Sequence, residues 1–141
     1  MADFASSFDA YFSWAGGPTG DDAIPVNSCN FSLSQSIDDK GRIASKVFGG
    51  TVFVQITPSG MDTMKQLWEW MIDADGKKES AQIEFRNIDS EQVQKKLELT
   101  DVYCVQYSES FTEVGSAPMS LSLTLTAREL KMFDTAHINR W

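Results

Sequence analysis

The segment PMSLSLTLTA, residues 118–127, restricts the fold more than any other part of this chain. Leu and Ala occupy the odd positions from 121 to 127, whereas Ser and Thr occupy the even positions from 120 to 126. A period of two is the spacing of side chains along a β-strand, in which neighbouring residues point to opposite faces of the sheet. The segment therefore predicts a strand with one face in the core.

Five other segments show the same alternation less completely, and turn residues separate them. They cover residues 3–14, 24–35, 51–57, 81–88 and 96–107. Most links between them are too short for the crossover that parallel strands require, so the strands should pair antiparallel. Six or seven strands of this kind predict a mainly β fold, a small antiparallel β-barrel or sandwich.

One segment follows a helical period. Between residues 61 and 72, apolar residues recur at spacings of three and four, which is typical of an amphipathic helix. Ser59 and Asp62 form a start signal of the S-x-x-D type just before it. The 141 residues are therefore expected to form a single domain, residues 1–141, with one flanking α-helix at about residues 61–72.

The connection SIDDKGRIASKVFGG, residues 36–50, is unusually long for a link between two antiparallel strands, which is usually roughly two to five residues. A long loop within a compact domain is usually functional or disordered. Disorder is disfavoured because Ile43, Val47 and Phe48 would be left in water. We expect these three residues to be buried against a neighbouring molecule or against the base of the loop.

The same loop carries charges of both signs, on Asp38, Asp39, Lys40, Arg42 and Lys46. Mixed charges can complement a second copy of the same chain. A head-to-tail contact joins different patches of two copies and therefore repeats. The residues alone favour a self-assembling β-domain whose projecting loop makes the repeated contact.

Composition argues against several classes of partner. The chain has 12 basic and 20 acidic residues, a net charge of −8, and no basic segment of the kind that binds nucleic acid or an anionic membrane surface. No apolar run approaches the roughly 20 residues that span a bilayer. The N-terminus lacks the basic and apolar regions of a signal peptide.

Candidate chemistry is equally sparse. Cys29, Cys104 and His137 are too few for a zinc cluster, and two cysteines make no disulfide framework, so we expect reduced, packed thiols. The sequence contains no phosphate-binding loop, nucleophile elbow or metalloprotease motif. The glycines of FGG, residues 48–50, precede a strand rather than a helix and do not predict a phosphate site. We therefore expect that the protein is not an enzyme and that it binds no metal ion or cofactor.

Two features, the tryptophans and a row of Ser and Thr residues, bear on which surfaces meet other molecules. Trp14 and Trp68 fall on apolar faces and are expected in the core. Trp70 lies about 200° around the helix from Trp68, so we expect it to point outward and to anchor a subunit interface. The uncharged residues Ser120, Ser122, Thr124 and Thr126 face either bulk solvent or a water-filled channel.

Longer segments resemble a known family. CNFS followed by DDKGR and VFGGTVFVQI is similar to the first half of Hcp tube proteins of type VI secretion, particularly their divergent TssD branch. LTDVYCVQYSESF, GSAPMSLSLTLTARELK and the closing NRW are similar to the second half. The resemblance covers about residues 29–141.

The resemblance implies a small β-barrel with a helix on its flank. Six such subunits would form a ring with a central channel, and rings would stack into the inner tube of a contractile injection machine. A sheath, a spike and secreted effectors would be its partners. The tube would assemble in the cytoplasm and be secreted by the type VI apparatus without a signal peptide, and it would have no catalytic activity.

The resemblance gives a role to two sets of residues, the lumen face and the stacking loop, and the helix argument gives one to Trp70. Ser120, Ser122, Thr124 and Thr126 become candidates for the lumen face. Trp70 becomes a candidate ring contact on the helix argument and not on a family motif. The ring-stacking loop would comprise Asp38, Asp39, Lys40, Gly41, Arg42, Ile43 and Lys46.

Three other functions are kept as alternatives. A monomeric β-sandwich could bind carbohydrate or protein through exposed aromatic residues, which form 11% of the chain. A tube protein of a related contractile particle would share most of these features. A small hydrolase would need a carboxylate pair that the sequence cannot place.

Overall fold

The computed structural model describes residues 8–45, 47–58, 60–73, 75–113 and 119–139. The first four elements are β1 (Phe8–Trp14), the short 3-10 helix η2 (Gly20–Asp22), β2 (Ile24–Ser34) and β3 (Phe48–Ile56). The helix α1 (Met61–Ile72) follows. The last four are β4 (Lys78–Asn87), β5 (Val93–Phe111), β6 (Met119–Met132) and β7 (Thr135–Ile138).

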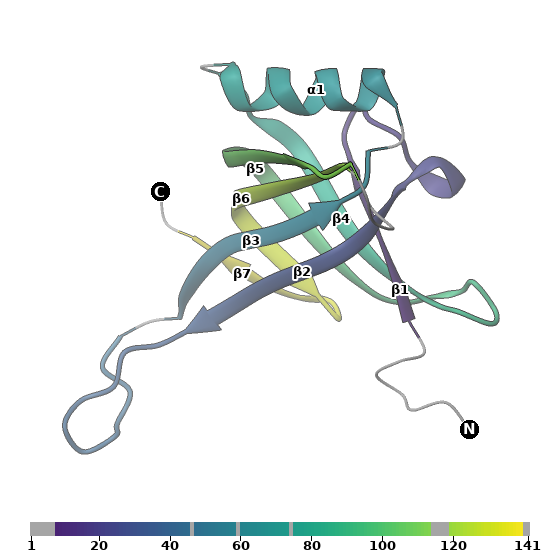
Figure 1. Cartoon of the computed structure of the whole chain (residues 1–141). Coiled ribbons are helices and arrows are strands. Elements are labelled where there is room, and N and C mark those ends of the chain that lie inside the picture. Colours follow the sequence, from purple (N-terminus) through teal and green to yellow (C-terminus); the bar gives the residue numbers. More distant parts are fainter. Residues whose placement is uncertain (1–7, 46, 59, 74, 114–118, 140–141) are drawn as a thin grey trace.

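All strand pairs are antiparallel, in the order β3-β2-β1-β4-β5-β6-β7. A further pairing, of β3 with β6 from Thr51↔Thr126 to Ile56↔Leu121, joins the two ends of the sheet. The first six strands thus close on themselves, and β7 extends the sheet below β3 (Figure 1). This confirms the predicted mainly β fold with one helix.

The alternation is confirmed in detail over residues 119–127, the described part of the segment. Leu121, Leu123 and Leu125 are completely buried. Their neighbours in register are Ile56, Val54 and Val52 of β3, which are also completely buried. Since burial of a Leu or Val side chain contributes about 1.5–3 kcal/mol, the seam between β3 and β6 is part of the core that holds the barrel closed.

The helix α1 lies across one end of the barrel (Figure 1), with the predicted bounds. Its buried residues are Thr63, Leu67 and Trp70. Gly60 is the N-cap residue, and Ser59, the predicted start signal, lies outside the described residues. The prediction that residues 61–72 form the flanking helix is therefore confirmed.

The expected orientation of the two helix tryptophans is wrong. Trp70 is 3% exposed, whereas Trp68 is 53% exposed. The ring of Trp70 lies 6.4 Å from that of Trp14, which in turn lies 5.4 Å from Phe12. The apolar residues of α1 cover more than half of its circumference, so the sequence is compatible with two orientations of the helix about its own axis. The aromatic stack of Trp70 on Trp14 in the barrel mouth selects the orientation that buries Trp70.

Gly50, near the start of β3, has a packing role. Gly50 has a φ of +111°, and a Cβ at this position would collide with the side-chain amide of Asn139. That amide donates a hydrogen bond of 2.9 Å to the carbonyl of Ala127. Close approach of β3 to the backbone of β6 and to the Asn139 side chain is therefore what Gly50 permits.

Candidate assembly surfaces

The loop between β2 and β3 contains a small hairpin of its own at residues 36–45. Ile37 and Ile43 form an antiparallel bridge. Backbone bonds close the turn on both sides of this bridge, from Asp38 N to Arg42 O at 2.8 Å and from Ala44 N to Ser36 O at 2.8 Å. Figure 1 shows that this hairpin projects from the barrel at the end away from α1.

Asp38 organises the tip of the hairpin. Its Oδ1 accepts hydrogen bonds from the backbone N–H groups of Lys40 and Arg42, both at 2.9 Å. Its Oδ2 accepts a bond of 2.9 Å from the guanidinium of Arg42. The backbone bond from Arg42, followed by that from Lys40 and by the guanidinium contact, outweighs desolvation and lowers the pKa of Asp38.

Replacing Asp38 by Ala should loosen the hairpin without unfolding the barrel. We expect hydrogen exchange of the Lys40 and Arg42 amides to become roughly tenfold faster, as measured by NMR. Because the folded pKa is lowered, wild-type protein should keep these bonds from neutral pH down past the ordinary value of 3.8. It should lose them as the pH falls through the lowered pKa.

Asp39 provides the matched control for this prediction. Asp39→Ala removes an adjacent carboxylate and leaves the bonds of Asp38 intact, so the two amides should exchange at the wild-type rate. Equal exchange rates in the two variants would show that Asp38 does not hold the turn.

The apolar residues of the loop are not buried within this chain. Ile37 is 67% exposed, Ile43 is 69% exposed and Val47 is 38% exposed. Burial of Ile43 against the base of the loop, one of the two expected outcomes, is therefore wrong, whereas Val47 lies partly against that base, where it lines an apolar groove. Lys46 and the side chain of Phe48 lie outside the described part of the chain.

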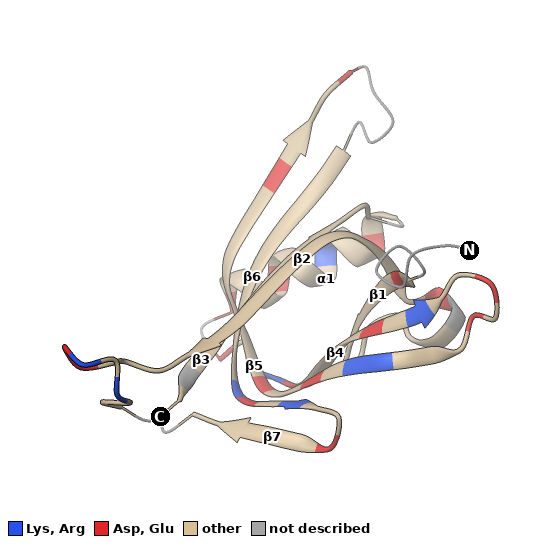
Figure 2. Ribbon diagram, turned by 90° about the horizontal axis from the view of Figure 1, so that it is seen from below, with Lys and Arg blue, Asp and Glu red and all other residues tan. Residues whose placement is uncertain are grey.

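Four neighbouring strand segments form an uncharged outer face. They are residues 27–34 of β2, 48–56 of β3, 119–127 of β6 and 102–108 of β5, and they contain no Asp, Glu, Lys, Arg or His. The chain as a whole is 23% charged. Figure 2 shows β2 and β3 free of coloured segments, while acidic and basic residues follow β4 and the adjoining stretch of β5.

The strand register places polar residues of this face side by side. One row runs through Asn30, Phe53, Thr124 and Gln106, and a second through Ser28, Gln55, Ser122 and Ser108. Phe53, which is 37% exposed, is the apolar member of these rows. The hydroxyl of Thr124 donates to the side-chain oxygen of Gln106 at 3.2 Å. The predicted Ser/Thr face is thus the middle of a wider four-stranded polar layer.

Each side of this layer ends in a strand edge. Strand β1 pairs with β2 only from Phe12↔Ile24 to Ala10↔Val26, so among the described residues β2 has no strand partner beyond Ser28 on that side. Strand β4 pairs with β5 only between Val93 and Val102, so no other strand of the described chain covers the corresponding edge of residues 104–111. Open edges are the usual site at which a strand of another chain adds to a sheet.

Beyond the barrel, the ends of β5 and β6 continue as a two-stranded arm (Figure 2). We define the β5–β6 arm as residues 110–120. Ser110↔Ser120 and Phe111↔Met119 pair only with each other in the described chain, and Phe111 is 71% exposed. An isolated two-stranded ribbon is marginally stable in water, so this arm is expected to need a neighbour.

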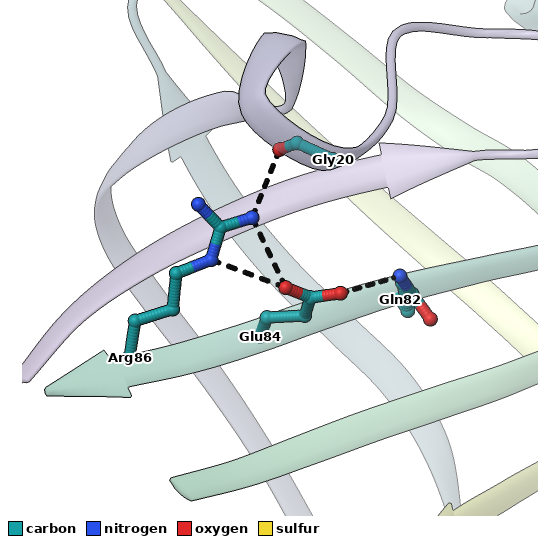
Figure 3. A network of polar contacts seen from close by, with 4 residues as sticks. All are labelled: Gly20, Gln82, Glu84 and Arg86. Carbon is teal, nitrogen blue, oxygen red and sulfur yellow. Dashed lines mark hydrogen bonds and ion pairs between the residues drawn. The ribbon is translucent and has the colours of Figure 1, made fainter. Parts of the chain in front are cut away.

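The opposite half of the barrel carries a polar network that ties the chain to itself (Figure 3). The Arg86 guanidinium donates to Glu84 at 3.1 Å and to the carbonyl of Gly20 at 2.9 Å. Gln82 donates to the other Glu84 oxygen at 2.8 Å, and Arg86 also lies 4.2 Å from the ring centre of Tyr11. The network fastens the connection between β1 and β2 to β4 and is structural.

Trp68, rather than Trp70, is the aromatic residue that α1 exposes. Its ring meets that of Tyr107 edge to face, with the centroids 5.4 Å apart. Desolvation, with a smaller contribution from Glu109, raises the pKa of Tyr107 to about 12. Tyr107 is therefore neutral in the physiological range, and it forms a neutral aromatic pair in which Trp68 is exposed and Tyr107 is partly buried.

The remaining candidate groups do not form a catalytic or metal centre in the part of the chain that the structure describes. No three His, Cys, Asp or Glu residues there are placed to hold a metal ion. Cys29 and Cys104 are free thiols, and burial raises the pKa of Cys104 to about 11. None of the described helices is long and apolar enough to cross a membrane.

An apolar groove of about 560 Å³ lies at the base of the loop. Phe31 and Leu33 of β2, Val47, Leu130 and Met132 of β6, and His137 are among its lining residues. The His137 ring forms a hydrogen bond of 2.9 Å with the side chain of Asn139, two residues further along the chain. The groove opens at the same end of the barrel as the loop.

The uncharged layer, the open strand edges and the projecting loop are the features of a structural protein that assembles with other chains. The family model described as hemolysin coregulated protein Hcp (TssD) matches residues 6–141, and the chain belongs to this family. Its members are structural tube proteins of type VI secretion, which that system secretes, and the family is not one of enzymes.

Solved structures agree with the family. Hcp1 from Flavobacterium johnsoniae is 25% identical, with 94% of this chain and 100% of that chain covered and a TM-score of 0.82. Hcp1 from Salmonella typhimurium is 15% identical, with 89% and 85% covered and a TM-score of 0.72, which shows the same fold. No protein of the curated set matches the sequence significantly.

Sequence reasoning missed two of these surfaces. The partners of Thr124 on β2, β3 and β5 follow from strand register, which the sequence does not give directly. The absence of charge from four separate strand segments was visible in the sequence and could have marked them as one face. The open strand edges had no sequence signal, because they depend on where β1 and β4 stop pairing.

Proposed function

We propose that this chain is the repeating subunit of a type VI inner tube. Six copies form a ring, and rings stack head-to-tail into a hollow tube that a contractile sheath expels with its spike. Effectors travel in the channel. The subunit assembles in the cytoplasm, leaves the cell through the type VI apparatus without a signal peptide, and acts without catalysis, cofactor, nucleic acid or membrane insertion.

The observation that carries this proposal is the uncharged four-stranded layer with an open edge on each side. In a ring, the edge of β5 in one copy adds to the edge of β2 in the next, so that the layers join into one continuous wall. Backbone hydrogen bonds would then occupy the donors and acceptors of both edges. Closure by rotation gives each copy two neighbours and leaves neither the β2 edge nor the β5 edge free.

The lumen face follows from the same arrangement. Ser120, Ser122, Thr124 and Thr126 lie in the middle of the layer and face away from the core, as the register with β3 and β5 supports. A wall of short hydroxyl side chains without fixed charge exerts no long-range attraction on a passing protein. It would let cargo of either charge move through the channel.

The hairpin of residues 36–45 supplies the stacking contact. It projects from one end of the barrel, is ordered by its own hydrogen bonds and exposes apolar side chains that the chain itself does not bury. Asp38, Asp39, Lys40, Gly41, Arg42, Ile43 and Lys46 form this stacking loop. Trp70 is not proposed as a contact, because its side chain is buried.

Microscopy and mass measurement test the ring directly. Purified protein at micromolar concentration should elute with about six times the subunit mass of 15.7 kDa and show ring-shaped particles in negative stain. Three-dimensional reconstruction of the rings should place Thr124 at the channel. A monodisperse monomer without ring particles at this concentration would overturn the proposal.

The alternatives have less support. A carbohydrate-binding sandwich needs several tryptophans on one open face, but Trp14 and Trp70 are buried and leave Trp68 as the exposed one among the described residues. A hydrolase is disfavoured by the family. A tube protein of a related contractile particle would share this fold, but the match to the type VI family favours the type VI tube over it.

A further inference from the structure

Two exposed apolar patches lie at opposite ends of the molecule. The first is the loop pair, Ile37 and Ile43, which are 67% and 69% exposed. The second is the helix stripe, Met61, Trp68 and Ile72, which are 78%, 53% and 64% exposed. Figure 1 shows α1 across the top of the molecule and the loop at its lower left extremity.

The helix stripe is a continuous surface. Its residues are spaced by seven and four positions, so they lie on one side of the helix. That side is opposite Leu67 and Trp70, which are buried in the barrel mouth. The stripe therefore points out of this end of the molecule and is accessible to another chain.

The loop pair is ordered before any contact forms. Ile37 and Ile43 are directly bridged, so their side chains lie on the same side of the hairpin. The turn is held by Asp38 through its two backbone acceptor bonds at 2.9 Å. A patch that is already ordered loses little conformational entropy on docking.

The charges around the two patches are complementary. Residues 36–47 carry three basic and two acidic side chains, a net charge of +1 in a chain of net charge −8. Residues 61–75, which include the helix stripe, carry one basic and four acidic side chains, a net charge of −3. Opposite charges around two apolar centres orient an encounter and disfavour pairing of two like patches.

We propose that the loop pair of one copy docks on the helix stripe of a second copy in the adjoining ring. This inference rests on the proposed function and names the partner surface of the stacking loop. The apolar groove at the base of the loop is not the receptor, because it opens at the same end as the loop, whereas head-to-tail stacking brings a loop to the opposite end of its neighbour.

Disulfide trapping tests the contact. Ile43→Cys and Ile72→Cys in one chain should crosslink under mild oxidation, since a disulfide needs Cα atoms within about 7 Å. Each copy carries one cysteine of each kind, so the product should be a ladder of several linked copies on a non-reducing gel. Each single variant should give no such ladder.

The matched control moves one cysteine to an exposed apolar residue away from α1. Val93 is 49% exposed at the turn between β4 and β5, so Ile43→Cys with Val93→Cys should give no ladder. A second, independent variant, Ile37→Ser with Ile43→Ser, should leave rings intact and raise the protein concentration needed for stacked tubes by roughly tenfold or more.

The outcomes separate the two proposals. Stacked tubes without the Ile43–Ile72 ladder, or with an equal ladder in the Val93 control, would overturn the loop-to-helix contact and leave the tube function standing. Stacking unchanged in the Ile37→Ser, Ile43→Ser variant would do the same. Absence of rings from the wild-type protein would overturn the tube function itself, and the contact with it.

Discussion

Replacing Trp70 by alanine should lower the free energy of unfolding by about 3–5 kcal/mol, the usual cost of removing a large buried aromatic side chain. Trp70 is 3% exposed and packs on Trp14 in the mouth of the barrel. Its removal would leave a cavity between α1 and the strands. Denaturant unfolding followed by far-ultraviolet circular dichroism measures the effect.

Trp68→Ala is the matched control, since it makes the same substitution on the same helix. Trp68 is 53% exposed and contacts Tyr107, so we expect a loss of about 1 kcal/mol or less. Equal losses in the two variants, or a larger loss for Trp68, would show that α1 packs with the rotation that the sequence alone suggested.

The second large effect is expected on assembly. Replacing residues 110–120 by Asn-Gly should remove the β5–β6 arm and close the shortened hairpin with a two-residue turn between Glu109 and Leu121. We expect the apparent dissociation constant of the ring to rise by at least about tenfold, because the arm and with it the exposed Phe111 at the end of the open β5 edge are lost. Size-exclusion chromatography with light scattering measures the change.

The barrel itself should survive this deletion. None of the described residues of the arm belongs to the buried core, so the unfolding free energy of the dissociated subunit should change by about 1 kcal/mol or less. Replacing residues 87–92, the other hairpin turn of β5, by Asn-Gly shortens the chain at a site away from the open edge and should leave rings intact. Rings in the arm deletion that are as stable as wild-type rings would exclude the arm from the interface.

Local patterns predicted the strands and the helix well. The alternation of Leu and Ser or Thr in β6, and the helical spacing of residues 61–72, depend only on near neighbours, and the structure confirms both. β7 was not located, because four residues are too few to show a period. Where the strands stop pairing is a property of the whole sheet and could not be predicted.

The helix tryptophans show where local reasoning ends. Trp70 and Ile72 widen the apolar stripe of α1 to more than half of its circumference, so the sequence does not say which part of that surface meets the barrel. The stack of Trp70 on Trp14 decides it, through residues far apart in the chain. For the loop, length and composition indicated a contact device, but only the bridge between Ile37 and Ile43 shows which side chains are presented together.

The positions of the loop pair and the helix stripe have a consequence for the size of the assembly. Because the two patches lie at opposite ends of the molecule, no finite stack that uses this contact buries all of them. One end always displays loops and the other always displays helices, so the two ends are chemically different and each remains open to growth. The contact therefore sets polarity but not length, and a limit on length must come from subunit supply or from a component that covers one end.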